Sequence, residues 1–352
     1  TGNPQITFFK VVYRRHTNFS MEAIEQTING TSTLGAAITT GTVTVSRNGD
    51  LVHKVYVQSS TDDITDGDKI VNEVELEIGG QLIDRHYEEW NQIWAELTTP
   101  ESKALAYKNM TGSLSHGLNK TGTAGVGLVQ VPLQFWFCRN PGLALPLIAL
   151  QYHEVKLILN HDFNAGYSAH TGNRLFVDYI YLDTDERRRF AQVSHEYLIE
   201  QVQEQSVTAQ SSSELNFNHP VKELVWCVNA TTGVLAAIGS GTATYQLKLN
   251  GHDRFAARDW RYFSRAQVWQ HHTGAGGLTA AANTDGSFSD GIGVYSFALN
   301  PEEHQPSGTC NFSRIDNAQF VQTAGGAATM VYAVNYNVLR IMSGMGGLAY
   351  SN

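Results

Sequence analysis

Apolar and polar residues alternate along most of the chain, in short runs that are separated by Gly- and Asn-containing turns. This period of two residues is typical of half-buried antiparallel strands. In the first half it predicts strands at residues 21–29, 41–47, 50–58, 71–78, 131–138, 152–159 and 175–182. In the second half it predicts strands at residues 197–203, 214–217, 221–228, 244–249, 294–299, 311–320 and 329–342. About eight short strands per half favour an all-β protein of two tandem eight-stranded antiparallel jelly rolls, with short helices in the loops.

Two segments depart from the strand period and predict helices. Residues 84–97 place Tyr87, Trp90, Ile93, Trp94 and Leu97 on one face at helical spacing, and residues 254–269 form the corresponding segment of the second half. We interpret the aromatic face as packing against a sheet, in preference to a surface on which a ligand stacks.

The sequence repeats itself weakly at long range. Residues 46–57 resemble residues 217–228, and residues 76–80 resemble residues 247–251, both at an offset of 171 positions. Residues 135–141 and 297–301 form a third, looser match. A repeat of this length indicates a duplicated domain and not a solenoid. We place the domains at residues 1–190 and 191–352, joined by the polar, Arg-rich segment 183–195.

Composition and charge narrow the function. Charged residues make up only 16% of the chain, below the roughly 25% of ordinary domains, which suggests that neighbouring subunits cover part of the surface. The net charge of −9 argues against direct nucleic-acid binding, because such binding depends on neutralising phosphates. Three cysteines at wide spacing predict no disulfide framework, and we expect reduced thiols that pack as small apolar residues.

Catalytic and cofactor motifs are missing from the sequence. It contains no G-x-S-x-G, H-E-x-x-H or Walker-type motif, so we predict neither enzymatic activity nor a cofactor. Residues 62–73 resemble a calcium loop, but Ile64 replaces a required acid, and we interpret the segment as an acidic hairpin tip. The adjacent His271 and His272 could bind a metal, but adjacent histidines in a loop are more often simply exposed, and we expect that here.

Glycosylation is possible at several Asn-x-Ser/Thr tripeptides, although such tripeptides are common by chance in a chain rich in these residues. Asn109, Asn119 and Asn229 are the candidate acceptors, and the first two fall in a long predicted loop. Tripeptides also occur at Asn18, Asn29 and Asn311.

Five segments carry a resemblance to a known family. They are residues 1–10, 13–19, 46–51, 175–183 and the C-terminal stretch 332–352. Together they resemble the major capsid proteins of nucleocytoplasmic large DNA viruses, especially those of large algal viruses. This resemblance implies a double jelly roll that trimerises into pseudo-hexagonal capsomers, which tile an icosahedral shell assembled in the host cytoplasm. It also implies contacts with neighbouring capsomers, with minor capsid proteins and with an inner viral membrane.

Two other functions remain as alternatives at this point. A carbohydrate-binding spike or adhesin would need only one barrel, and a cupin-like metalloenzyme would need His and Glu clustered inside a barrel.

Three placements follow from the capsid interpretation. Residues 99–130 and 273–291 should form an outward crown, while Arg14, Arg15 and His16 lie at the inward base, where they can meet anionic lipid or acidic proteins. Counting strands predicts that loops 59–70, 99–130 and 161–174 share one end of the first barrel. The linker should be a rigid strut in which Arg187, Arg188 and Arg189 clamp carboxylates or carbonyls.

Overall fold

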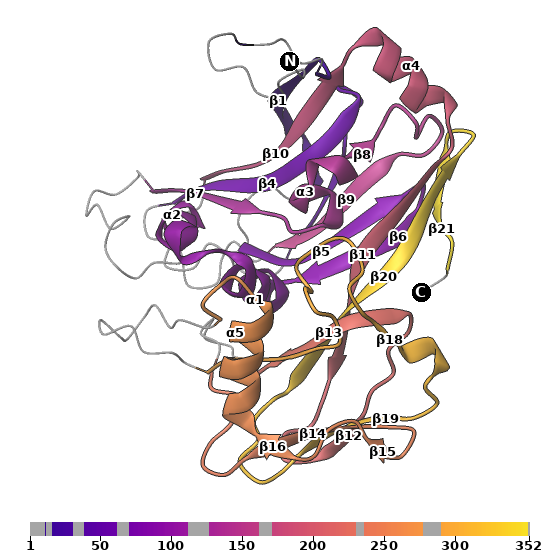
Figure 1. Ribbon diagram of the computed structural model, residues 1–352. Helices are drawn as coiled ribbons and strands as arrows, with labels where there is room; N and C mark the ends of the chain where they lie inside the picture. The colour runs from indigo at the N-terminus through magenta and orange to yellow at the C-terminus, as the bar shows by residue number, and fades with distance from the viewer. Residues whose placement is uncertain are drawn as a thin grey trace, which may run out of the picture.

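Two β-barrels are stacked along the long axis of the molecule, with helix α1 between them (Figure 1). The computed structural model describes residues 11, 16–30, 39–61, 70–111, 127–161, 171–229, 236–276 and 290–350. All strand pairs within these residues are antiparallel, as the alternating pattern predicts.

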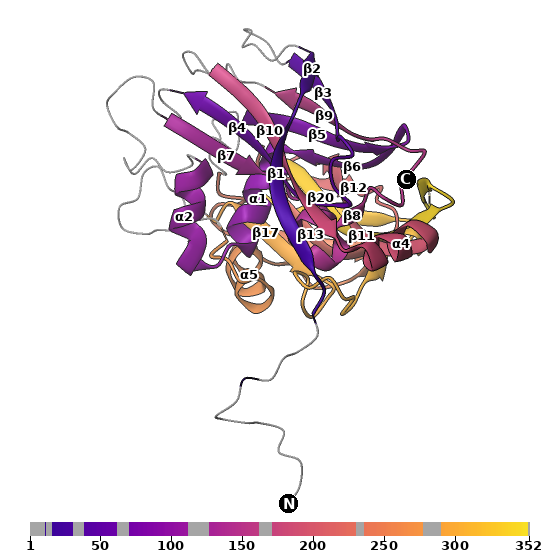
Figure 2. The same cartoon turned by 90° about the horizontal axis from the view of Figure 1, so that it is seen from above.

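The first barrel consists of two sheets that face each other. One has the order β1-β10-β4-β7, with β8 added to β4, and the other has the order β2-β3-β9-β5-β6. Their bounds are β1 (Phe19–Gln26), β2 (Ile28–Gly30), β3 (Thr39–Thr44), β4 (Leu51–Thr61), β5 (Val71–Ile78), β6 (Gln81–Tyr87), β7 (Gly127–Pro132), β8 (Leu145–Pro146), β9 (Val155–His161) and β10 (Thr171–Leu182). Seen from above, β1 lies outermost on the near side of this barrel (Figure 2).

The second barrel repeats this arrangement. One sheet has the order β11-β20-β13-β17, with β18 and β21 attached, and the other has the order β12-β19-β14-β15, with β16 attached. Their bounds are β11 (His195–Ser206), β12 (Ser212–Glu214), β13 (Pro220–Cys227), β14 (Thr244–Leu249), β15 (His252–Asp253), β16 (Arg258–Asp259), β17 (Ile292–Ser296), β18 (Cys310–Asn311), β19 (Ala318–Gln322), β20 (Met330–Met342) and β21 (Met345–Leu348). Two facing antiparallel sheets in each half, of five or six strands each, confirm the double jelly roll.

The long-range repeat marks equivalent strands. β4 and β13, which carry the first matched pair of segments, hold the same position in their sheets. β5 and β14, which end in the second pair, are also equivalent, and the third pair follows β7 and β17. The weak sequence match therefore records the duplication of a barrel.

The helices lie in connections between strands. They are α1 (Glu88–Thr98), α2 (Glu101–Thr111), α3 (Trp136–Arg139), α4 (Thr184–Gln192) and α5 (Gln267–His271), with short 3-10 helices at Pro141–Leu143 and Phe312–Arg314 and a π-helix at Tyr262–Ala266.

Several predicted boundaries were wrong. Residues 84–87 belong to strand β6 and not to the helix, and residues 258–259 form a strand within the second predicted helix. The strand predicted at 131–138 stops at Pro132 and gives way to α3, while the one at 311–320 is interrupted by a 3-10 turn. Short apolar runs fit both periods, so the pattern alone cannot separate helix from strand there. The predicted long loop at 99–130 begins with α2.

Strand register confirms which end of the first barrel carries the long loops. Thr61 pairs with Gly127, Ser60 pairs with Thr171, and His161 pairs with Val71. The described ends of all three predicted loops therefore meet at one end of the barrel. Residues 62–69, 112–126, 162–170 and 277–289, which make up most of these loops and of the predicted crown, lie outside the described residues.

Each barrel has its own apolar core. In the second barrel the Trp226 ring contacts those of Tyr245, Phe263 and Phe320, with centroids 5.1 to 5.4 Å apart. In the first barrel, inward side chains of both sheets pack together, such as Val55, Val74 and Leu157.

Candidate functional site: the interface between the barrels

The contact between the two barrels combines a buried apolar cluster with buried ion pairs. We call it the inter-barrel interface. It comprises α1, α3 and β6 of the first half, together with β11, β13, β20, β21 and the segment after α5 in the second half.

Helix α1 brings the apolar side of this interface. Its buried Trp90, Ile93, Trp94 and Leu97 pack on the outer face of the β11-β20-β13-β17 sheet. The Trp90 ring lies 5.5 Å from that of Tyr332 and 5.6 Å from that of Trp94. The aromatic face thus packs against a sheet, as predicted, and the sheet belongs to the other barrel. Burying side chains of this size stabilises the contact by roughly 1.5–3 kcal/mol each.

The ends of β11 and β20 extend this contact into the first barrel. Ile199, Leu339 and Ile341 belong to the apolar core of the first half and not to that of the second. Backbone and side-chain bonds accompany them: the Gln201 side chain donates to the Ile83 carbonyl, and the Val202 N–H donates to Asp84 Oδ1 at 3.1 Å. The two barrels therefore share part of one core.

A buried carboxylate, Glu200, joins three elements by ion pairs. Arg139 Nη1 of α3 lies 2.7 Å from Glu200 Oε2, and Lys222 Nζ of β13 lies 2.9 Å from Glu200 Oε1. Burial alone would raise the pKa of Glu200, but Lys222, His304 and Arg139 outweigh it and hold that pKa at about 2. The Arg139 guanidinium also stacks 3.9 Å from the centroid of the Trp94 ring. Glu200 is therefore a permanent anion that ties α3 to the second barrel.

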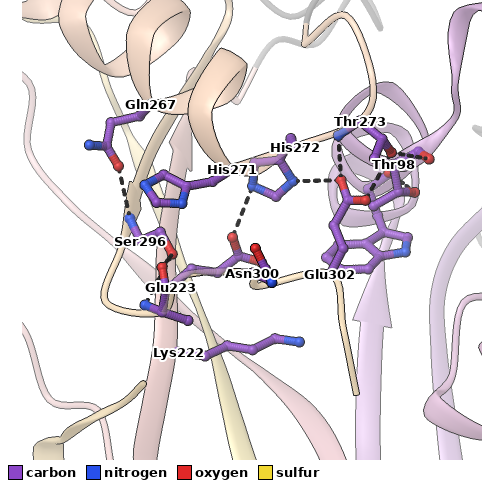
Figure 3. Close-up of polar contacts among 12 residues, drawn as sticks. Thr98, Lys222, Glu223, Gln267, His271, His272, Thr273, Ser296, Asn300 and Glu302 are labelled. Carbon is purple, nitrogen blue, oxygen red and sulfur yellow. Dashed lines mark hydrogen bonds and ion pairs between the residues drawn. The ribbon is translucent and has the colours of Figure 1, made fainter. Parts of the chain in front are cut away.

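A second ionic group surrounds His272 (Figure 3). His272 Nε2 lies 3.0 Å from Glu223 Oε2, and His272 Nδ1 lies 3.0 Å from Glu302 Oε1. The side chains of His272 and Glu223 are completely buried. Burial by itself would lower the pKa of His272, but Glu223 and Glu302 raise it by more than burial lowers it, and the pKa is about 9. His272 is therefore an imidazolium at neutral pH, held between two carboxylates.

The chain after His272 attaches this group to the first barrel. Thr273 Oγ1 donates to Glu302 Oε2 at 2.8 Å and lies 3.1 Å from the Thr98 carbonyl, to which it can donate instead. The Gly274 N–H donates to the Leu97 carbonyl at 2.7 Å. A Cβ at Gly274 would lie 2.6 Å from the Leu97 carbonyl oxygen, so only glycine fits at this contact. The ionic group and the end of α1 are consequently one connected structure.

The C-terminal hairpin closes the other side of the interface. β21 pairs with the end of β20, and its Gly346 backbone forms a hydrogen bond with His153 Nδ1 of the first barrel. The Tyr152 N–H donates to the Gly344 carbonyl at 3.0 Å.

This arrangement fixes orientation and offers little reactive chemistry. Its charges compensate one another, and within the described ranges no group of three or more His, Cys, Asp or Glu side chains is placed to hold a metal ion. The three cysteines are free, and burial raises the pKa of Cys138 to about 12, so that thiol is unreactive. In the described part of the chain, no helix is long and apolar enough to cross a membrane.

The predicted linker residues lie outside the interface. Arg187 Nε lies 2.9 Å from Asp50 Oδ1, so it fastens α4 to the first barrel only. Arg188 and Arg189 are exposed on α4, and the segment is a helix that starts at the side-chain cap of Asp183. A strut role for these three arginines stays a prediction.

The other predicted sites are spread over the molecule. Asn109 is exposed on α2, Asn229 is exposed after β13, and Asn119 lies outside the described residues. His16 is exposed, whereas Arg14 and Arg15 lie outside the described residues. Of the calcium-like loop, residues 62–69 lie outside them, and Glu73 pairs with Arg85 at 2.9 Å.

Sequence reasoning missed the ionic groups, and it was wrong about His272. We expected His272 to be exposed, but it is the C-cap of α5 and its side chain is buried between carboxylates. One signal was present: Lys222 and Glu223 are adjacent charges inside an otherwise apolar strand, which is costly unless both are paired.

Comparison with known proteins gives a consistent picture over the whole length. A family model described as "Major capsid protein N-terminus" matches residues 7–183, and one described as "Large eukaryotic DNA virus major capsid protein" matches residues 186–347. The chain is 53% identical to the major capsid protein of Pyramimonas orientalis virus and 42% identical to that of Paramecium bursaria Chlorella virus 1, covering 100% of this chain and 96% of each relative.

Solved structures agree with the sequence relatives. A chain of the PBCV-1 virus capsid model superposes with a TM-score of 0.81 at 37% identity, covering 98% of this chain and 100% of that one. The Faustovirus major capsid protein superposes with a TM-score of 0.72 at 11% identity, covering 96% and 93%, which supports the fold.

Proposed function

Because the chain belongs to the family of major capsid proteins of large eukaryotic DNA viruses, we propose that three copies form a pseudo-hexagonal capsomer that tiles an icosahedral shell. The protein is a structural subunit of a virion capsid. The proposal adds to this role that the subunit forms a trimer and that the trimers form a lattice.

The duplicated barrel held by one rigid interface carries this proposal. Three copies of a two-barrel subunit place six similar barrels around a three-fold axis, which approximates six-fold symmetry. Such a tile works only if the angle between its barrels is fixed, because an error in that angle recurs at every subunit. The shared core at Ile199 and Leu339, the ion pair of Glu200 with Arg139 and the backbone bond of Gly274 to Leu97 support that constraint.

We also keep the finer predictions as part of the proposal. The division at residues 190 and 191 falls inside α4, so the barrels are separate in topology but need not fold separately. The crown at one end and the base at Arg14, Arg15 and His16 give surfaces for minor capsid proteins and for an inner membrane. The net charge of −9 disfavours direct contact with the genome.

The alternative functions are less well supported. A carbohydrate-binding adhesin would not require similarity to capsid proteins along the entire chain. The relatives are structural proteins, which suggests a role without catalysis.

Mass measurement in solution tests the proposal. Light scattering at micromolar concentration should give three times the 38.8 kDa of one chain, and negative-stain images should show particles with a hexagonal outline. A protein that remains monomeric under these conditions would contradict it.

A further inference from the structure

Strand β1 is an open edge of the first barrel. It ends the sheet β1-β10-β4-β7, and it pairs with β10 from Phe19↔Leu182 to Gln26↔Leu175. None of the described strands pairs with its other side. The first five residues of β1 are all exposed, and Figure 2 shows the strand lying outermost. Such an edge offers unpaired backbone groups to an extended segment.

The side chains of β1 do not protect this edge. Phe19 and Met21 lie on one face of the strand and are 61% and 49% exposed. Lys and Pro are among the residues that block natural edges most effectively, and β1 contains neither. Its only charges are Glu22 and Glu25, which make contacts at 3.3 Å with Tyr181 and at 3.6 Å with Arg174. The edge therefore suits an extended partner that is apolar and positively charged.

The N-terminal segment of this chain has that chemistry. Residues 5–15 read Gln-Ile-Thr-Phe-Phe-Lys-Val-Val-Tyr-Arg-Arg, with β-branched and aromatic residues, three positive charges and no acid. Eleven residues are enough to cover the eight of β1. Val11 is 98% exposed, so it does not pack against β1 of its own chain.

We propose that residues 5–15 of one copy add as an extra strand to the free edge of β1 in a neighbouring copy. Backbone hydrogen bonds would supply affinity, while Lys10, Arg14 and Arg15 would meet the acidic Glu22 and Glu25. Apolar residues of the added strand would cover Phe19 and Met21. This inference rests on the proposed function, since only a subunit that meets further copies can exchange a segment.

Site-directed cross-linking of full-length chains tests the exchange. A tagged Val11→Cys chain and an untagged Ala23→Cys chain are co-expressed and mildly oxidised. Leu128→Cys replaces Ala23→Cys as a matched control, because Leu128 is 49% exposed on β7 at the opposite edge of the same sheet. Each single variant alone measures how much disulfide forms with the native Cys310, which is free and half-buried.

We expect a disulfide between tagged and untagged chains for Val11→Cys with Ala23→Cys, several-fold more abundant than with Leu128→Cys. Adding Glu22→Lys to the Ala23→Cys chain should lower the yield, and Arg14→Glu with Arg15→Glu in the tagged chain should restore it. Equal yields for the two edges would overturn the proposal. So would a Val11→Cys/Ala23→Cys double variant that forms only an intrachain disulfide. Residues 5–15 that anionic vesicles protect from proteolysis, and other copies of the chain do not, would overturn it as well.

The outcome is separable from that of the proposed function. If the mass in solution is that of a trimer but the cross-link is absent, strand addition fails and the capsomer stands. If the unmodified chain is monomeric, the proposed function fails, and strand addition, which needs a second copy, fails with it.

Discussion

Removing the charge of His272 should weaken the inter-barrel interface in a way that depends on pH. We consider His272→Gln, which keeps a polar side chain of similar reach but cannot carry a positive charge. The variant leaves Glu223, which is completely buried, and Glu302 without the cation between them. Breaking a buried ion pair by removing one partner costs about 3–5 kcal/mol.

The pKa of His272 gives an independent magnitude. Its value rises from 6.5 to about 9, and each pKa unit corresponds to about 1.4 kcal/mol, so protonation adds about 3 kcal/mol to folding. Because the pKa is raised in the folded protein, this contribution is complete below pH 6.5. It declines as the pH rises and is lost once the pH passes about 9.

Thermal and urea unfolding between about pH 6 and pH 10 measure this effect. The difference in stability between the unmodified protein and His272→Gln should be largest at pH 6 and should shrink toward pH 10. Taking the difference removes contributions from other groups that titrate in the same range. His271→Gln is the matched control, because the neighbouring ring is half-buried and its Nδ1 lies 3.0 Å from the Leu299 carbonyl oxygen and not between carboxylates.

A constant difference across this pH range would refute the assignment of a charged His272. Equal stability of His272→Gln and the unmodified protein at pH 6 would refute a stabilising role for the ionic group of His272, Glu223 and Glu302.

Three further perturbations address the same interface. Gly274→Ala should destabilise the protein by more than about 1 kcal/mol, since its Cβ would meet the Leu97 carbonyl at 2.6 Å. Gly347→Ala is the control in urea unfolding, because its φ is not positive and its Cβ would meet nothing closer than Gln81 Oε1 at 3.5 Å. Glu200→Gln should cost about 3–5 kcal/mol, because Lys222 is left buried without its anion, and a melting temperature equal to that of the exposed-site variant Glu196→Gln would contradict this. Arg187→Ser should cost about 1 kcal/mol, because Arg187 is 58% exposed and water can replace it, while the buried Asp50 keeps the hydrogen bond from the Leu182 N–H. Replacing Arg187, Arg188 and Arg189 together by Ser tests the strut, which fails if trimer yield and melting temperature do not change.

The fold could be predicted from the sequence because its signals are local and repeated. Alternation gives the strands, and the offset of 171 positions pairs β4 with β13 and β5 with β14. The helical spacing around Trp90 and Trp94 correctly indicated a packed face. It could not say that the face meets the other barrel, since periodicity identifies which residues are buried but not their partner.

The ionic groups could not be predicted because their members come from distant positions. Glu200 meets Arg139 across 61 residues, and His272 meets Glu223 across 49. Adjacent histidines in a polar segment are usually exposed, and only tertiary contacts with two carboxylates reverse that expectation for His272. Long-range charge pairing is therefore the part of this site that a single sequence leaves undetermined.

Apolar and ionic contacts make different contributions to the interface. The α1 face and the shared core bury large surfaces, and they would hold the barrels together at several similar angles, because apolar contact is not directional. The pair of Glu200 with Arg139 and the hydrogen bond from the Gly274 N–H to the Leu97 carbonyl require particular distances and orientations. Buried ion pairs add little net stability compared with well-packed apolar residues, but misaligned ones leave costly unpaired charges. The angle between the barrels is therefore selected mainly by the penalty for every other angle, which is the property that a repeating shell subunit needs.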